Sequence, residues 1–384
     1  MKPVSDAVLH SKKSSIRKLF ELFLKSTDAI SLGIGQPDFQ TPENIMNGIR
    51  KALDNQKTMY PPALGIDELR EAVGEKFRKE NSMRWVQKEN VMVTVGGSQA
   101  IALTFAALTN PGDEILINSP NFLSYYYIPA YYHTNLVEVA RNPDYSINFE
   151  QLERKITPKT KLLIINSPNN PTGYVLTKNE VEKVVDLVIK HDLYLLSDEV
   201  YEKYLYNGRT HISPASLDGV EDRTITINSI SKTFSATGLR VGYLAAPADI
   251  IPLMEKYAQY TAAGTAHPIQ YGAVAGIKNG NPKMAEIIRK YDERRKYSFK
   301  RLEELNFDCP IPHGAFYIMP SVKNYAKTGD QFSEDLFNKQ KVAVVGGSSF
   351  GSFSSDKVRI SYATTKENLE KAFERIEKYL EDLK

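Results

Sequence analysis

The sequence predicts an α/β protein, with a mostly parallel sheet in a three-layer α/β/α large domain and a smaller α+β domain after it. From about residue 91 to residue 247, short aliphatic runs alternate with helical stretches. Continuous apolar strands interleaved with helices are typical of a parallel sheet that is covered on both faces. The length of 384 residues also suits about two domains, at roughly 150 residues for each.

Seven runs of four or five residues are expected to form the strands of the large sheet. They are Val91–Val95, Glu114–Asn118, Leu136–Val139, Lys161–Ile165, Leu193–Leu196, Thr224–Ile227 and Val241–Ala245. Between the fourth and fifth runs, Thr177 and Glu180 have the spacing of a capping box. Valines follow at helical spacing, so this segment is predicted to be a crossover helix.

The smaller domain is expected to begin with a long amphipathic helix over Met284–Leu305. Three strands, at Ala315–Met319, Val342–Val345 and Lys357–Ser361, precede a final helix from Lys366 onward. We therefore expect a large domain over residues 46–283 and a small domain over residues 284–384. Residues 1–45, with a helix near Ser15–Lys25, are expected to pack with the small domain or to cover a site.

Composition excludes several classes of function. The 49 basic and 46 acidic residues leave a formal charge of only +3, which does not indicate a nucleic-acid partner. The apolar runs are too short to cross a bilayer and the N-terminus lacks the apolar core of a signal peptide, so a cytoplasmic location is expected. Cys309 is the only cysteine and the six histidines show no metal-ligand spacing, so no catalytic metal is expected.

Polar or glycine-rich segments follow five of the predicted strands. They are residues 96–99, 119–122, 166–173, 197–201 and 229–232. In open parallel sheets, ligands bind beyond the carboxyl ends of the strands, where loops converge and helix N-termini point into the crevice. The sequence therefore predicts a ligand site along this edge.

Each of these segments also has a plain structural interpretation. The glycines of Gly96-Gly97-Ser98-Gln99 could bring backbone N–H groups to a phosphate, or could simply form a tight turn. Asp198 could serve a cationic partner in the crevice, or could cap a helix. Lys232 could be desolvated, with the lowered pKa that imine chemistry needs, or could be an ordinary surface lysine. Arg240 favours the functional interpretation, because with the nearby serines it would hold a dianionic phosphate.

Four motifs together identify a family. They are Ser-Ile-Ser-Lys-Thr-Phe-Ser-Ala-Thr-Gly-Leu-Arg-Val-Gly, Asn-Ser-Pro-Asn-Asn-Pro-Thr-Gly, Ser-Asp-Glu-Val-Tyr and Ser-Leu-Gly-Ile-Gly-Gln-Pro-Asp-Phe. With Val-Arg-Ile-Ser-Tyr-Ala around Arg359, they stand in the order and spacing of class I/II aminotransferases of pyridoxal-phosphate (PLP) fold type I. The chain resembles the aspartate/aromatic branch of that family, and its archaeal members in particular, from about Ser14 to the C-terminus.

The resemblance implies roles at the reacting end of the cofactor. Lys232 would carry PLP as a Schiff base and then move the proton of the substrate Cα as a general acid and base. Asp198 would keep the pyridine nitrogen protonated, and Tyr201 and Asn170 would bond the cofactor's phenolic oxygen. The same turn of the family implies that the Asn170–Pro171 peptide bond is cis.

The resemblance also implies groups that bind the phosphate, the ring and the substrate carboxylate. Phe122 would stack on the ring, Arg359 would clamp the α-carboxylate with Asn170 and the Gly35 backbone beside it, and Tyr60 would reach the phosphate of a neighbouring subunit in a homodimer. The expected phosphate ligands are Gly97, Ser98, Gln99, Ser229, Ser231 and Arg240.

The resemblance implies that the substrate is an amino acid, with 2-oxoglutarate as the expected acceptor. Some aspartate aminotransferases of this branch carry a lysine where this chain has Ser98. Without that charge, and with Tyr60, Phe122, Tyr125 and Phe20 expected near the pocket, an aromatic or broad range is favoured. An aspartate aminotransferase and a PLP-dependent β-lyase or decarboxylase stay as alternatives.

Two functions outside this chemistry have little support. A PLP-binding regulator would need a DNA-binding module, and no room for one is seen before Gly33. A nicotinamide dehydrogenase would need a GxGxxG motif after the first strand, where Gly96-Gly97-Ser98 stands instead.

Overall fold

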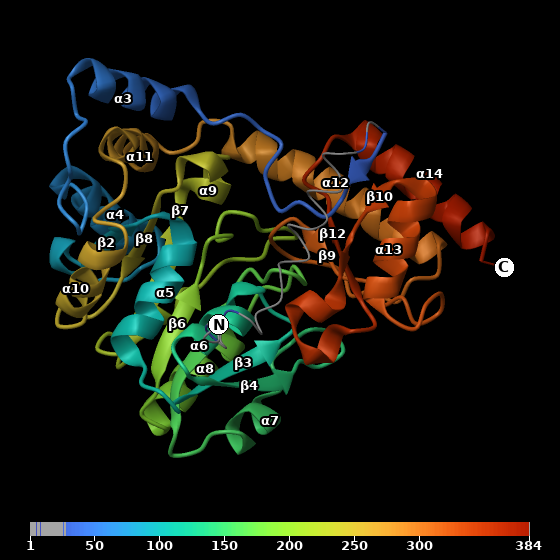
Figure 1. Ribbon diagram of the computed structural model, residues 1–384, viewed down its shortest axis with the longest axis horizontal. Coiled ribbons are helices and arrows are strands. Elements are labelled where there is room, and N and C mark those ends of the chain that lie inside the picture. Colours follow the sequence, from blue (N-terminus) through green and yellow to red (C-terminus); the bar gives the residue numbers. More distant parts are fainter. Residues whose placement is uncertain (1–4, 6–7, 9–25, 27, 384) are drawn as a thin grey trace, which may run out of the picture.

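The computed structural model describes residues 5, 8, 26 and 28–383 of the chain (Figure 1). The helix predicted near Ser15–Lys25, and Phe20 with it, lies outside the described residues. Among the helices that are described, none is long and apolar enough to cross a membrane.

A seven-stranded sheet forms the centre of the molecule, and all seven predicted runs are strands of it. From one edge to the other the strands are β2 (Val91–Thr94), β8 (Gly242–Ala245), β7 (Thr224–Ser229), β6 (Tyr194–Asp198), β5 (Thr160–Asn166), β3 (Glu114–Ser119) and β4 (Asn135–Ala140). Six strands run in one direction, and β8 runs against both of its neighbours. The fold class is therefore as predicted, a mainly parallel α/β sheet.

Helices cover both faces of this sheet because strand residues alternate between two cores. Leu196 packs into the core under α5, whereas its neighbour Leu195 packs into the opposite core under α8. The first face holds α5 (Gly96–Leu108), α6 (Ser124–Tyr131) and α10 (Ile251–Thr261), and the second holds α7 (Phe149–Arg154) and α8 (Lys178–Lys190). The predicted capping box is confirmed, because Thr177 and Glu180 bond each other's backbone N–H at the start of α8.

A third core lies beyond β2 and β8. Here α3 (Glu43–Asp54) packs on α11 (His267–Asn279), and α4 (Asp67–Glu80) lies beside them (Figure 1). Gly272 and Gly276 allow α11 to approach α3 closely, because an added Cβ at either would fall within 3 Å of Ile45 or Ile49. Short 3-10 turns lie at Lys88–Asn90 (η1) and Pro214–Ser216 (η2).

The long helix α12 (Met284–Glu304) leads to the C-terminal part of the molecule, as predicted (Figure 1). That part contains α13 (Gly329–Gln340), α14 (Lys366–Glu381) and an antiparallel sheet of β11 (Val345–Gly346), β12 (Val358–Ser361) and β9 (Tyr317–Ile318). The 3-10 turns η4 (Gly347–Phe350) and η5 (Ser352–Ser354) precede β12. A buried cluster centred on Phe316, Tyr291 and Phe373 joins these elements.

One predicted strand, Val342–Val345, is wrong as a single element. Its first half, β10 (Val342–Ala343), pairs in parallel with β1 (Ile30–Ser31), whereas its second half is β11, which pairs with β12. The apolar run is continuous because both halves are buried, so composition alone does not reveal the change of partner. This pairing ties the segment before Gly33 to the C-terminal part of the chain.

Candidate active site

A pocket of about 380 Å³ lies at the carboxyl edge of the large sheet. It gathers residues from the ends of five strands and from the segment after β1. Twelve of the predicted site residues line it, namely Gly35, Gly97, Ser98, Phe122, Asn170, Asp198, Tyr201, Ser229, Ser231, Lys232, Arg240 and Arg359.

The reversed strand β8 explains how Arg240 reaches this edge. Thr94, at the end of β2, and Ser229, at the end of β7, both pair with Gly242, the first residue of β8. Arg240 precedes that residue by two positions, so it lies at the edge where the parallel strands finish. The short helix α9 (Ile230–Thr233) and the turn η3 (Thr237–Leu239) fill the link between β7 and β8, and α9 carries Lys232.

Lys232 is held in a desolvated, positively charged environment. Its Nζ donates a 2.6 Å hydrogen bond to the carbonyl oxygen of Gly35. Burial, with Arg359 and Arg240 nearby, lowers the pKa of the Lys232 amine to about 8, although Asp198 opposes the shift. A larger fraction of this amine is therefore neutral near pH 7 than for an exposed lysine, and the neutral amine is the nucleophilic form.

Asp198 is buried at the end of β6 and accepts hydrogen bonds from the Tyr125 hydroxyl and from the Val200 N–H, the latter at 3.2 Å. Burial raises the pKa of this carboxyl to about 6, while the hydrogen bonds from Tyr125 and Val200 act in the opposite direction. The carboxylate is thus a buried charge that its hydrogen bonds only partly compensate at neutral pH, and a cation in the pocket would stabilise it.

Another group of lining residues can hold an anion. The Ser229 side chain caps α9 through the Ser231 N–H, and the two hydroxyls lie 2.8 Å apart. Gly96 has a φ of +70°, and an added Cβ would lie 2.5 Å from an Arg240 guanidinium nitrogen. Only glycine permits that approach, so the guanidinium lies against the N-terminus of α5. The first backbone N–H groups of a helix can bind an anion because they have no partner within the helix.

Arg359 projects from β12 into the pocket and is only 1% exposed. It donates to Asn170 Oδ1 at 3.0 Å and to the Gly33 carbonyl oxygen at 2.5 Å. Within the part of the chain that the structure describes, its Nε has no hydrogen-bond partner. A buried donor without a partner is costly, so the site has an unmet demand for an acceptor such as a carboxylate.

Two predicted residues lie apart from these. The Gln99 side-chain oxygen accepts a 2.7 Å hydrogen bond from the Val95 N–H, and Gln99 is not among the lining residues. Tyr60 is 88% exposed beside a separate surface hollow formed with residues 262–268. The roles of both remain predictions. The Asn170–Pro171 bond is cis, as predicted, and so are Ser119–Pro120 and Ser167–Pro168.

Sequence reasoning missed some of the residues that organise the pocket. Tyr125 was expected as an aromatic pocket residue, but its hydroxyl bonds Asp198. The Tyr317 hydroxyl lies 2.7 Å from that of Tyr201, and Asn166 donates to the Asp198 carbonyl oxygen at 3.0 Å. The motif Asn-Ser-Pro-Asn-Asn-Pro-Thr-Gly begins with Asn166 and was a usable signal, whereas nothing in the sequence distinguishes Tyr317 from the other tyrosines.

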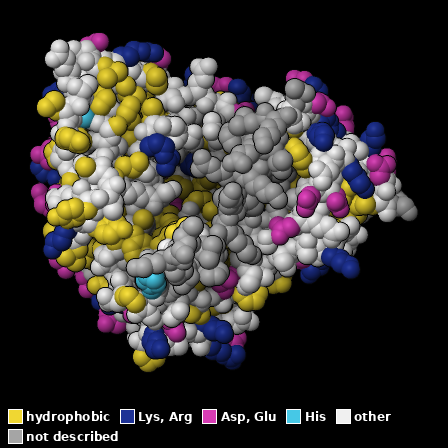
Figure 2. All heavy atoms as spheres, in the orientation of Figure 1, with side chains coloured by type: hydrophobic (Ala, Val, Ile, Leu, Met, Phe, Trp, Pro, Cys, Tyr) yellow, Lys and Arg dark blue, Asp and Glu magenta, His cyan; other side chains and the backbone are white. Residues whose placement is uncertain are grey.

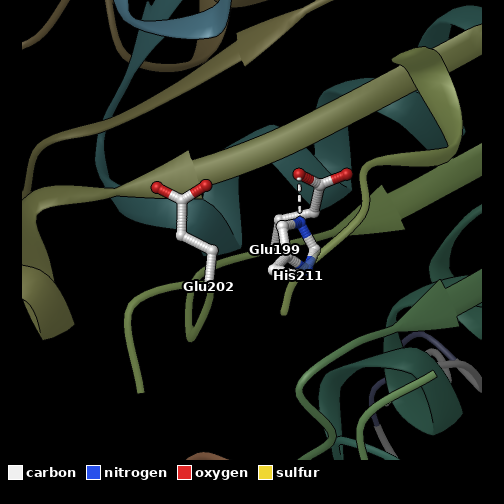
Figure 3. A group of neighbouring side chains, drawn as sticks. All are labelled: Glu199, Glu202 and His211. Carbon is white, nitrogen blue, oxygen red and sulfur yellow. Dashed lines mark hydrogen bonds and ion pairs between the residues drawn. The ribbon is translucent and has the colours of Figure 1, made fainter. Parts of the chain in front are cut away.

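A second cluster of ionisable side chains lies next to Asp198 in sequence but outside the pocket lining (Figure 3). In it, His211 lies 2.8 Å from Glu199, and Glu202 forms an ion pair with Lys76. Asn81 donates to both carboxylates, and two serine hydroxyls bond Glu199. Against the effect of burial, Lys76 and nearby cations lower the pKa of Glu202 to about 2. Protein groups thus satisfy all four carboxylate oxygens, as expected for a structural network.

Comparison with known proteins agrees with this geometry. The family model for aminotransferase class I and II matches residues 27–376. The chain is 44% identical to the aromatic-amino-acid aminotransferase 2 of Thermococcus litoralis and 44% identical to the aspartate aminotransferase of Pyrococcus abyssi, in each case over 99% of both chains. The solved aromatic aminotransferase of Pyrococcus horikoshii superposes with a TM-score of 0.89 at 42% identity, over 96% of this chain and 99% of that one.

Fold and site together define a PLP-dependent enzyme of fold type I. The chain belongs to the class I and II aminotransferases, in the aspartate/aromatic branch, and its cofactor is pyridoxal phosphate. The charged groups of the pocket match the groups of that cofactor. Lys232 offers an amine of lowered pKa, Asp198 needs a cationic partner, and Arg240 with the start of α5 offers an anion site. No other charged group is needed to accommodate the aldehyde, ring nitrogen and phosphate.

Proposed function

We propose that this aminotransferase takes its amino group from an aromatic amino acid, or from a broad range that includes aromatic ones, and passes it to a 2-oxo acid such as 2-oxoglutarate. The observation that carries this proposal is the character of the pocket wall. Among the residues that the structure describes, the cationic ones that line it are Lys232, Arg240 and Arg359, and the proposed reaction already uses them for the cofactor aldehyde, the phosphate and the α-carboxylate. The remaining lining includes Ile34, Ile101, Phe122, Leu123 and Val200. An apolar wall favours an apolar side chain.

The proposed reaction divides the work among residues that the pocket brings together. Pyridoxal phosphate, when bound, withdraws the electron pair that the departing Cα proton leaves behind. Asp198 keeps a proton on the ring nitrogen, and Tyr201 and Asn170 bond the phenolic oxygen. Lys232 would hold the cofactor covalently through its Nζ, and the same nitrogen, once freed by the substrate amine, would carry the Cα proton.

Substrate and cofactor positioning are assigned to other groups. Arg359 binds the α-carboxylate through its planar fork, next to Asn170 and the backbone of Gly35. Phe122 covers the face of the ring. The phosphate is bound by Gly97, Ser98, Gln99, Ser229, Ser231 and Arg240. Arg359, Arg240 and Lys232 line the same pocket, which brings the proposed carboxylate and phosphate sites near the Lys232 amine.

Covalent labelling tests the assignment of Lys232. Purified protein should show the visible absorbance of bound cofactor, and borohydride reduction followed by peptide mapping should place the label on Lys232. Lys232→Ala should lose both the label and turnover, whereas Lys178→Ala, which changes an exposed lysine, should keep both. Wild-type turnover by Lys232→Ala would refute the mechanism.

A half-reaction screen tests the substrate range. Phenylalanine, tyrosine, aspartate and alanine are each mixed with the holoenzyme, and the spectral change from the aldehyde form to the amine form of the cofactor is followed. We expect the aromatic amino acids to give the highest rate per unit concentration. Aspartate specificity is the second candidate, because a relative of that name is as similar as the aromatic one. A rate for aspartate at least tenfold above that for tyrosine would establish it.

We also propose a homodimer with shared sites. Large apolar side chains are exposed on α10 and on the loop before α4, including Tyr260 at 88% and Met59 at 76%. Figure 2 shows hydrophobic side chains gathered over the end of the molecule that holds α3, α10 and α11 in Figure 1. An exposed patch of this kind favours burial against a second copy, from which Tyr60 would reach the neighbouring phosphate. Analytical ultracentrifugation tests this, and Tyr60→Phe should weaken cofactor binding without dissociating the dimer.

Two further assignments are proposals of the same kind. We place the domain boundary at the start of α12, with residues 46–283 in the large domain, residues 284–384 in the small domain and residues 1–45 associated with the small domain or the site. The pairing of β1 with β10 supports this last association. A cytoplasmic location is proposed because the substrates and the cofactor are metabolites of that compartment.

A further inference from the structure

Tyr317 lies between the two halves of the pocket. It is a residue of β9, and Ser361 of β12 stands directly opposite it in the antiparallel pair. Side chains alternate along a strand, so Arg359, two positions from Ser361, shares a face with Tyr317 as its diagonal neighbour. The guanidinium carbon of Arg359 lies 4.4 Å from the centre of the Tyr317 ring and 5.0 Å from the centre of the Phe350 ring. Two aromatic rings thus pack against the guanidinium.

The other end of Tyr317 reaches the cofactor side of the pocket. Its hydroxyl lies 2.7 Å from the hydroxyl of Tyr201, and the two rings meet edge to face at 5.7 Å. Gly35 makes room for this contact, since an added Cβ there would lie 2.1 Å from the Tyr317 hydroxyl oxygen. One buried side chain therefore touches Arg359 through its ring and Tyr201 through its hydroxyl.

The number of available protons determines which tyrosine donates in the Tyr201–Tyr317 hydrogen bond. Tyr201 has a single hydroxyl proton, and in its proposed role it donates that proton to the phenolic oxygen of the cofactor. The proton in the Tyr201–Tyr317 hydrogen bond must then come from Tyr317. A donor on the Tyr201 oxygen polarises the Tyr201 O–H bond and strengthens its hydrogen bond to the cofactor.

The geometry points to Tyr317 as a positioning residue that couples the carboxylate clamp to the cofactor: its ring orients Arg359 and its hydroxyl strengthens the hydrogen bond that Tyr201 donates. The inference rests on the proposed roles of Arg359 and Tyr201. Tyr317 lines the pocket, and in this scheme it acts through those two residues.

Three single variants separate the two effects. A titration of the absorbance of bound cofactor against pH gives one pKa for the holoenzyme, which we call the spectroscopic pKa. Tyr317→Phe keeps the ring and removes the hydroxyl, so it should raise the spectroscopic pKa by about half a unit. It should change the affinity for a carboxylate less than twofold. Phe350→Leu removes the other ring on Arg359, so it should weaken binding of 3-phenylpropanoate or succinate about tenfold at unchanged spectroscopic pKa. Tyr317→Leu should show both changes.

A glycine variant tests the same coupling without altering the tyrosine. Gly35→Ala displaces the Tyr317 hydroxyl, so it should raise the spectroscopic pKa as Tyr317→Phe does. When Gly35→Ala is combined with Tyr317→Phe, it should cause no further rise in the spectroscopic pKa, because the hydroxyl that it displaces is already absent. Circular dichroism and cofactor content confirm that each variant is folded.

The outcomes distinguish this inference from the function on which it rests. Absence of a borohydride label on Lys232 in the wild type would overturn the proposed mechanism itself. With that label present, an unchanged spectroscopic pKa in Tyr317→Phe would overturn the coupling. An equal pKa shift in Phe350→Leu would also overturn it, since the effect would then belong to general packing around Arg359.

Discussion

The side-chain amine of Lys232 donates a 2.6 Å hydrogen bond to the carbonyl oxygen of Gly35, which stands 197 positions earlier in the chain. The neighbouring Gly33 carbonyl oxygen accepts from Arg359. Two backbone carbonyls of one short segment therefore meet the two cations that the proposed reaction uses most directly. The segment after β1 is part of the site through its main chain, and its side chains matter less for these contacts.

The lowered pKa of Lys232 predicts the pH at which the cofactor attaches. The amine reacts as its neutral form, so the rate of recombination of cofactor-free protein with pyridoxal phosphate should rise with pH and level off with a midpoint near 8. Stopped-flow absorbance measures this. Arg359→Gln removes one cause of the shift and should move the midpoint upward. A wild-type midpoint near 10.5, the ordinary value for lysine, would contradict the assignment.

The raised pKa of Asp198 predicts that the cofactor-free protein loses stability as the pH rises. Its pKa is about 6 when folded against 3.8 as the ordinary value, so the stability present below pH 3.8 is lost as pH rises through 6. Cofactor-free Asp198→Asn should therefore be more stable than cofactor-free wild type at pH 7.5, by up to about 3 kcal/mol, and the gain should shrink toward pH 4. Urea unfolding at the two pH values measures it.

The same substitution should have the opposite effect on the holoenzyme. Asparagine cannot balance a protonated ring nitrogen, so bound cofactor should stabilise the wild type more than Asp198→Asn. If Asp198→Asn is less stable than wild type at pH 7.5 both without and with cofactor, the buried carboxylate does not destabilise the cofactor-free protein.

Gly96 predicts a loss of phosphate affinity. Alanine there would be strained at a φ of +70° and would collide with the Arg240 guanidinium. Gly96→Ala should therefore weaken cofactor binding at least tenfold and lower the free energy of unfolding by about 1–3 kcal/mol. Gly238→Ala is the matched control, because nothing lies within 4 Å of its added Cβ. Fluorescence titration with pyridoxal phosphate compares the two, and equal affinities would count against the anion site.

Asp38 predicts an effect from outside the pocket. Its carboxylate accepts hydrogen bonds from the two terminal guanidinium nitrogens of Arg294, at 2.8 and 2.9 Å, and from the Tyr291 hydroxyl. These contacts with α12 hold the segment that presents the carbonyls of Gly33 and Gly35. Asp38→Asn should raise the KM for the amino acid several-fold with a smaller change in kcat. Glu293→Gln, which breaks an exposed ion pair on the same helix, should leave both unchanged.

The sequence predicted the strands and their polar ends because both are local patterns. The run of each strand is apolar, and residues such as Asp198 and Ser229 follow at its end. The direction of β8 was not predictable in this way, because a four-residue apolar run has no polarity along the sheet. Tyr317 was missed for a related reason, since its contacts with Arg359 and Tyr201 depend on the register of β9 and β12. Motifs identify residues that are close in sequence, whereas register determines which distant side chains meet.

The reversal of β8 has a consequence for how this enzyme can diverge. It brings both ends of one short stretch of chain to the pocket, so that this stretch supplies Ser229, Ser231, Lys232 and Arg240, while Gly35, Asn170 and Arg359 come from three separate stretches. A single inherited segment would thus keep the proposed Schiff-base lysine and part of the proposed phosphate site together. Substrate specificity can change through substitutions elsewhere in the chain. This agrees with a family whose members use the same cofactor on different amino acids.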